Sequence, residues 1–128
     1  MSIKICAKRK WNHTGYQLDA GVTYRFSAQG EWIDLDIPYS ADGGPSNGKL
    51  LQKLILRLTE HLRPRSKDNW FALIGAIGED ESTTFLIGSS LPIFVAPMSG
   101  ELTCYANDVG WAYFNNHGAV TLTVERAR

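Results

Sequence analysis

Four segments of the chain alternate apolar and polar residues, and this alternation constrains the fold more than any other feature. A period of two places successive side chains on opposite faces of an extended strand, so it is typical of strands that are buried on one side. Glycines lie between or beside these segments, at spacings that suit turns between short antiparallel strands. We therefore predict an all-β sandwich, jelly-roll-like, of about eight strands. The alternating segments are residues 3–7, 22–27, 103–105 and 120–124.

The length and charge of the chain limit its organisation and its partners. A chain of 128 residues is long enough to bury a core of its own, so we predict a single domain over residues 1–128. Thirteen basic and thirteen acidic residues give a formal net charge of zero. Such a chain has no global field that would recruit nucleic acid. A basic cluster near the amino end is interpreted as a solvated strand face, and it comprises Lys4, Lys8, Arg9 and Lys10.

One segment departs from the β pattern, because its apolar residues recur at helical spacing. We predict an inserted helix over about residues 49–61, with Ser46 or Asn47 as its N-cap and Pro64 just beyond its end. An apolar stripe of this kind usually packs a helix across one end of a sheet. The stripe comprises Leu50, Leu51, Leu54, Ile55, Leu58 and Leu62.

The amino end and the two cysteines suggest where the protein is found. The apolar residues before Lys8 form too short a run for a signal-peptide core, and no segment approaches the length of a transmembrane span. We therefore expect a cytoplasmic protein without membrane insertion, and leave export by a non-classical route open. Cys6 and Cys104 are interpreted as buried thiols, although their spacing does not exclude a disulfide between them.

The segment 105–118 combines one carboxylate with side-chain amides in a turn between two strand-like runs. Its carboxylate and amide side chains belong to Asn107, Asp108, Asn115 and Asn116. Calcium takes six to eight oxygen ligands at about 2.3 to 2.6 Å, and it mixes carboxylate, amide and main-chain oxygens. Asn and Asp also favour turns for purely local reasons, because they tolerate left-handed backbone. The segment is thus a candidate calcium site that has a purely structural alternative.

The same segment, with its flanking strands, resembles a known family. Asn-Asp-Val at 107–109, six intervening residues, Asn-Asn at 115–116 and Gly118 resemble the calcium-dependent, galactose-binding bacterial lectins of the PA-IL type. The resemblance extends to an apolar glycine-containing segment at 72–78 and to the segment 26–32, which ends in Trp32. It is dense from Trp70 onward and thin from Asp34 to Asn69. It implies a lectin-like, galactose-binding-domain-like sandwich that binds glycans and is not an enzyme.

The resemblance also implies a calcium ligand set and a sugar-contacting set. The implied metal ligands are the carboxylate of Asp108, the amide oxygens of Asn115 and Asn116, the main-chain carbonyl of Ala112, and Asp36. Sugar hydroxyls would complete the calcium shell. The implied ligand-binding residues are Leu35, Val109, Trp111, Asp108 and Asn115.

This sequence also departs from the family pattern. Trp111 and Phe114 stand where the family has small residues, and an aromatic ring could stack on the apolar face of a sugar. The family's sugar-gripping histidine and glutamine have no aligned counterparts in residues 42–69. We therefore expect calcium-assisted glycan binding, with a galactoside-like glycan as the first candidate. A homo-oligomer would supply the avidity that one shallow site lacks.

Two other functional classes are alternatives to glycan binding. An enzyme is disfavoured, because His13, His61 and His117 lie in no recognisable catalytic motif. A protein-interaction module that keeps the lectin fold without binding sugar remains open, with the helix, Trp111 and Phe114 forming its partner surface. The two readings differ in whether calcium leaves an open coordination position beside Asp108.

Overall fold

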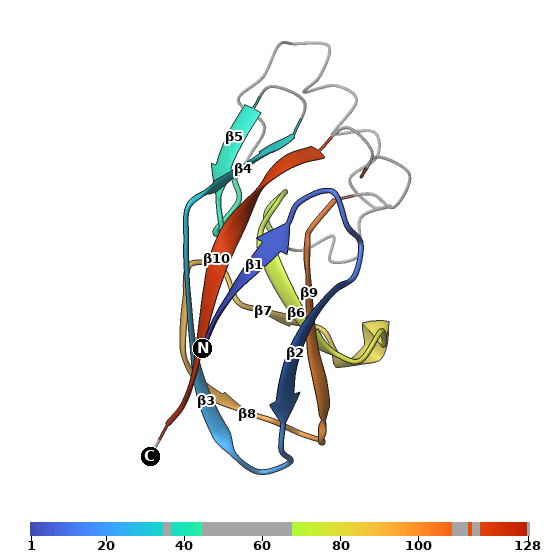
Figure 1. The fold of residues 1–128 in the computed structure, drawn as a ribbon, viewed down its shortest axis with the longest axis vertical. Helices are drawn as coiled ribbons and strands as arrows, with labels where there is room; N and C mark the ends of the chain where they lie inside the picture. The colour runs from blue at the N-terminus through green and yellow to red at the C-terminus, as the bar shows by residue number, and fades with distance from the viewer. Residues whose placement is uncertain (35–36, 45–67, 109–112, 114–115, 128) are drawn as a thin grey trace.

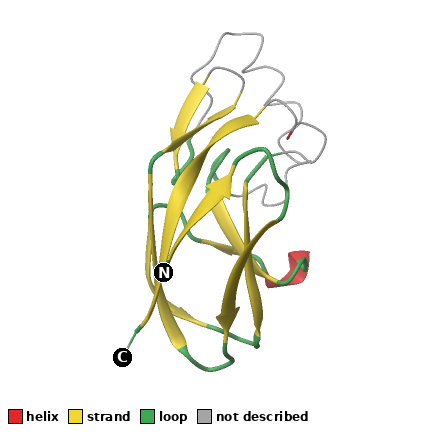
Figure 2. Cartoon of the chain, in the orientation of Figure 1, coloured by secondary structure: helices red, strands yellow, loops and turns green. Residues whose placement is uncertain are grey.

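The computed structural model describes residues 1–34, 37–44, 68–108, 113 and 116–127, and within them the chain is built almost entirely of β-strands (Figures 1 and 2). The described residues form ten strands and one turn of 3-10 helix at Glu81–Thr83. The strands are β1 (Ser2–Cys6), β2 (Asn12–Leu18), β3 (Thr23–Gln29), β4 (Glu31–Asp34), β5 (Ile37–Ser40), β6 (Leu73–Ile77), β7 (Phe85–Leu86), β8 (Ser90–Val95), β9 (Gly100–Ala106) and β10 (Asn116–Arg126).

The strands form two antiparallel sheets that face each other across one core. The six-stranded sheet has the order β5-β4-β10-β3-β8, with β1 also paired to β10, and the four-stranded sheet has the order β2-β9-β6-β7. The predicted all-β sandwich is confirmed, and the described part of the chain has ten strands where about eight were predicted. The predicted helix at about 49–61 lies outside the described residues. No helix in the described part of the chain is long and apolar enough to cross a membrane.

Strand β10 is the central element of the six-stranded sheet. It is 11 residues long, which allows it to pair with three different strands along its length. Its first residues pair with β4, from Asn116 opposite Asp34 to Gly118 opposite Trp32. Its middle pairs with β1 on one side, and its second half pairs with β3 on the other.

The core lies between the inward faces of the two sheets, as the alternating sequence predicts. Val120, Leu122 and Val124 of β10 are buried, while their neighbours in the strand are more exposed. They face a large apolar cluster from both sheets that includes Phe26 and Leu102. Burial of this surface is the main stabilising contribution to the fold.

A single buried amide joins the two sheets at one end of the sandwich. The side chain of Asn12 accepts a hydrogen bond from the Cys6 N–H at 2.9 Å and donates to the Cys6 carbonyl at 3.0 Å. It also donates to the Cys104 carbonyl at 3.0 Å. Because Cys6 ends β1 and Cys104 lies in β9, Asn12 satisfies main-chain groups of both sheets. Both cysteine thiols are free, and Cys104 is buried as predicted, whereas Cys6 is only partly buried. Burial raises the pKa of the Cys104 thiol.

His13, on the outer face of the four-stranded sheet, lies between two carboxylates. Its Nδ1 is 2.8 Å from Glu101 Oε1, and its Nε2 is 2.7 Å from Glu79 Oε2. The hydrogen bond to Glu101, and then that to Glu79, raises the pKa of His13 above 6.5. The hydrogen bond from His13, and then that from the Gly15 N–H, lowers the pKa of Glu101 below 4.5.

The contribution of the contact between His13 and Glu101 to the stability of the fold should depend on pH. Protonated His13 contributes fully below its unfolded pKa of 6.5, and that contribution is lost as pH rises through its higher folded pKa. Glu101 contributes above its unfolded pKa of 4.5, and that contribution is lost as pH falls through its lower folded pKa. The contact is therefore strongest between these two values.

We expect Glu101→Gln to bring the pKa of His13 back toward its ordinary value, and Glu79→Gln to do so by less. Glu101 provides the larger of the two effects on the imidazole, and the amide that replaces it carries no charge. An NMR titration of the His13 ring protons in the wild type and both variants measures this directly. An unchanged His13 pKa in both variants would show that the two carboxylates do not hold the ring.

Candidate functional site

The ends of three strands bring buried polar side chains together at one end of the sandwich. Strand β4 ends and strand β10 begins there, and β9 ends at the same end of the molecule (Figure 1). We call this region the rim, and define it as Asp34, Asn107, Asp108, Tyr113 and Asn116. All five residues are buried, although four of them carry side chains that are usually exposed.

Asp108 follows β9 directly, and its main chain is held in a tight turn. Its N–H donates to the Ala106 carbonyl at 2.8 Å, and the Tyr113 hydroxyl donates to the same carbonyl. The side chain of Asp108 is only 1% exposed. Burial, and then the negative charge of Asp108, raises the pKa of Tyr113, so this phenol stays protonated and keeps its hydrogen bond. A carboxylate is thus held at the end of β9 by contacts within the β9–β10 connection.

Asn116, the first residue of β10, contributes a buried amide oxygen to the rim. Its Nδ2 donates to the Ala7 carbonyl at 3.1 Å, which fixes the orientation of the amide. Its Oδ1 is buried and accepts no hydrogen bond within the described part of the chain. A buried acceptor without a partner costs about 1 to 3 kcal/mol. A cation at this position would satisfy the oxygen, so the donor chemistry of the rim fits a hard metal ion.

Asn107 has a structural role. This is the alternative to metal binding that the sequence allows for an Asn-Asp turn. Its side-chain amide donates to the Asn69 carbonyl at 3.0 Å, and its main chain exchanges hydrogen bonds with Phe71 and Ala72. These contacts hold Phe71 at a φ of 62°, a left-handed conformation that is uncommon for a bulky residue. The Phe71 carbonyl in turn accepts the indole N–H of Trp32 at 3.0 Å. Trp32 and Asn107 therefore form part of the framework that supports the rim.

The structure places two of the predicted site residues, Asp108 and Asn116, and both lie in the rim. The other predicted metal ligands, Asp36, Ala112 and Asn115, lie outside the described residues, as do the predicted sugar contacts Leu35, Val109 and Trp111. Asp34, which immediately precedes two of them, is buried opposite Asn116 in the β4–β10 pairing. The sequence makes Asp34 a lesser candidate than Asp36 for the metal, because the two share a face only if the strand continues regularly. Its place opposite Asn116 could not be predicted, because it depends on pairing between distant segments.

The described residues contain no group of three or more His, Cys, Asp or Glu side chains that could hold a metal. The predicted ligand set has a different composition, because it combines carboxylates with amide and main-chain oxygens. Calcium accepts such mixed sets. The calcium site remains a prediction that rests on the oxygens of Asp108 and Asn116.

Comparison with known proteins relates the chain to a lectin through its fold. No family model matches the chain, and no curated protein matches it in sequence. Its structure is similar to that of the N-terminal domain of EclA, described as a PllA-like lectin, with a TM-score of 0.69. The similarity covers 98% of this chain and 95% of that domain, at 21% sequence identity. The described part of the chain therefore shares the β-sandwich fold of that domain.

Proposed function

We propose that this protein is a non-enzymatic carbohydrate-binding module of the lectin type, with its glycan site at the rim. The proposal is supported by the fold that the chain shares with a PllA-like lectin domain. The observation that carries it is the buried amide oxygen of Asn116, which lies in the same strand-end region as the buried carboxylate of Asp108. A carboxylate and an amide oxygen are two of the ligand types that a calcium-assisted sugar site combines.

The residues of the rim have distinct roles in this proposal. Asp108 supplies the negative charge, Asn116 supplies a neutral oxygen, and Tyr113 fixes the turn that carries Asp108. Asp36, Asn115 and the carbonyl of Ala112 are proposed to complete the protein ligands. When bound, calcium would supply open coordination positions for the hydroxyls of a glycan. Leu35, Val109 and Trp111 are proposed to contact the sugar beside it.

A galactoside is the first ligand to screen, because the segment 107–118 resembles that of galactose-binding lectins. Only one metal and a few hydrogen bonds would hold the sugar, so a single site is expected to bind weakly. A homo-oligomer that presents several rims would raise the avidity without any new contact.

A calcium titration followed by a glycan screen tests this proposal. Calorimetric titration of chelator-stripped protein with calcium is expected to show one saturable site per chain. A glycan array read in calcium, and again in chelator, is expected to show binding only in calcium. No calcium binding by the intact protein would reject the proposal and favour the protein-interaction module instead. Calcium binding without any glycan signal would keep the metal site and reject the lectin activity.

A further inference from the structure

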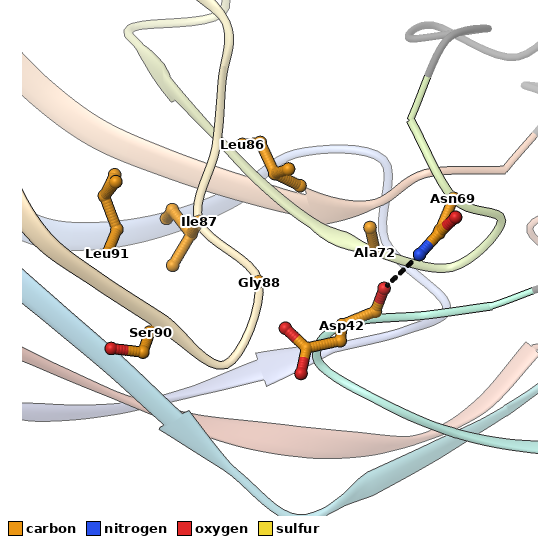
Figure 3. A pocket seen from close by; sticks show the side chains of 8 residues that line it. All are labelled: Asp42, Asn69, Ala72, Leu86, Ile87, Gly88, Ser90 and Leu91. Carbon is orange, nitrogen blue, oxygen red and sulfur yellow. Dashed lines mark hydrogen bonds between the residues drawn. The ribbon is translucent and has the colours of Figure 1, made fainter.

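A cavity of about 340 Å³ opens on the flank of the sandwich, where three chain segments meet (Figure 3). The segments are the turn after β5, the residues that lead into β6, and the connection from β7 to β8. We call this cavity the flank pocket, and its lining residues include Asp42, Asn69, Leu86, Gly88, Ser90 and Leu91. Its volume lies near the lower end of the range of about 300 to 1,000 Å³ that is usual for small-molecule sites.

The shape of the flank pocket is fixed by hydrogen bonds between its walls. The Asp42 carboxylate accepts the Ser89 N–H at 2.7 Å and the Ser89 hydroxyl at 2.6 Å, one on each oxygen. A Cβ on Gly88 would lie 2.7 Å from Asp42 Oδ1, so glycine allows the two segments to approach this closely. The Asn69 side-chain amide donates to the Asp42 carbonyl at 3.2 Å (Figure 3). The pocket is therefore formed before any ligand binds.

One side of the flank pocket is rich in hydrogen-bond acceptors. A carboxylate offers about four lone-pair sites, so Asp42 can accept further hydrogen bonds beside the two from Ser89. Asn69 lies beside it and adds an amide, while Ser90 lies farther along the wall with its hydroxyl pointing away from Asp42 (Figure 3). The described lining includes no Lys, Arg or His. An anionic ligand would meet an uncompensated carboxylate here, whereas a neutral ligand with several O–H donors would be well matched.

The opposite side of the flank pocket is aliphatic. Leu86 and Leu91 lie across the cavity from Asp42, together with the side chain of Ile87 (Figure 3). Leu86 is 42% exposed, so this wall remains accessible to a ligand from solvent. An occupant must therefore combine a C–H face with a face of hydroxyl groups, which is the character of a sugar ring.

We propose that the flank pocket binds one neutral sugar residue, with its hydroxyls toward Asp42 and Asn69 and its C–H face toward Leu86 and Leu91. This site is separate from the rim and uses no metal ion. It would give each chain a second, weaker point of contact with a glycan. Its binding is independent of the calcium site, so the two proposals can be tested separately.

The test is an NMR titration of isotope-labelled protein in chelator with the methyl glycosides of glucose, galactose and mannose, each added separately. We expect saturable shifts with at least one of them at the amides of Gly88, Ser90 and Leu91 and at the side chain of Asn69. Leu86→Glu should weaken this binding by about tenfold or more, because it places a charge on the aliphatic wall. Ile93→Glu is the matched control, since Ile93 is 73% exposed and does not line the pocket.

The outcomes separate this site from the rim and from other ligand classes. Asp108→Asn should leave the shifts unchanged in chelator, because the rim plays no part in them. The proposal is overturned if no glycoside gives saturable shifts at the pocket, or if Leu86→Glu and Ile93→Glu bind equally well. It is also overturned if only an alkylammonium ion shifts these resonances, since the pocket would then recognise a cation.

Discussion

Replacing Asp108 by asparagine is expected to weaken calcium binding by about a hundredfold or more, which corresponds to about 2.8 kcal/mol. Asparagine has nearly the same size and leaves the main-chain hydrogen bond to Ala106 in place. The substitution therefore removes the charge of the proposed metal ligand without rebuilding the turn. Calcium affinity rises with the number of charged ligands, so loss of this carboxylate should have the largest effect of any single change at the rim. Calorimetry and calcium-dependent glycan binding measure the result.

Asp19→Asn provides the matched control for this experiment. Asp19 is exposed and forms an ion pair with Arg126 at 2.7 Å, away from the rim. This variant removes the same charge from the protein, so it corrects for any general electrostatic effect on calcium. It is expected to bind calcium like the wild type. Equal calcium affinity in Asp108→Asn and Asp19→Asn would contradict the placement of the metal site.

Gly43→Ala is expected to destabilise the fold by about 2 to 5 kcal/mol, from two effects. Gly43 has a φ of +63°, and an L-residue pays about 1 to 2 kcal/mol in this left-handed region. Its new Cβ would also lie 2.0 Å from the Trp70 carbonyl oxygen and 2.5 Å from the Ala72 nitrogen. Overpacking typically costs a further 1 to 3 kcal/mol. The Trp70 carbonyl cannot easily move away, because it accepts the Gly44 N–H at 2.9 Å.

Gly21→Ala separates the clash at Gly43 from the backbone strain. Gly21 has a φ of +80°, and a Cβ there would meet nothing within 4 Å. Its substitution should therefore cost only the left-handed strain of about 1 to 2 kcal/mol. Urea unfolding of the two variants and the wild type gives both free energies. Equal losses in the two variants would mean that the turn at Gly43 relaxes away from residues 70–72.

The strands could be predicted from the sequence because their signal is local. In β10, the alternation of Val120, Leu122 and Val124 with polar residues reports directly which face is buried. The pairing of that strand with β1, β3 and β4 could not be predicted in the same way. Pairing depends on contacts between segments that are distant in sequence, and several registers would bury the same alternating residues.

The candidate site was only partly predictable, because the role of each amide depends on its neighbours. Asn107, Asp108 and Asn116 are of residue types that either form turns or coordinate a metal ion. Only the structure shows that Asn107 holds Asn69 whereas the Asn116 oxygen is buried without a donor among the described residues. Asn12, which joins the two sheets, carries no distinguishing signal in the sequence.

The basic cluster near the amino end shows a similar limit. The solvated strand face predicted there holds only for Lys4, which is exposed in β1. Lys8 and Arg9 are exposed but lie beyond the strand, and Lys10 is only partly exposed. Its ammonium group lies 3.6 Å from the centre of the Tyr105 ring and 2.7 Å from Glu81 Oε1. Desolvation by burial lowers the pKa of this lysine, and the hydrogen bond with Glu81 partly opposes the shift. Charge patterning within the cluster could not reveal partners that the fold brings from the 3-10 turn and from β9.

The position of β10 has a consequence for the synthesis of this protein. All other strands of the six-stranded sheet leave the ribosome before β10, yet β1, β3 and β4 each pair with it. A nascent chain that lacks β10 therefore exposes unpaired strand edges, which favour association with other chains. We expect the sheet to close only after translation has passed residue 126, at a rate limited by contacts between distant segments. During that interval we expect the unpaired edges to associate with other chains more readily than those of a chain that folds from local contacts.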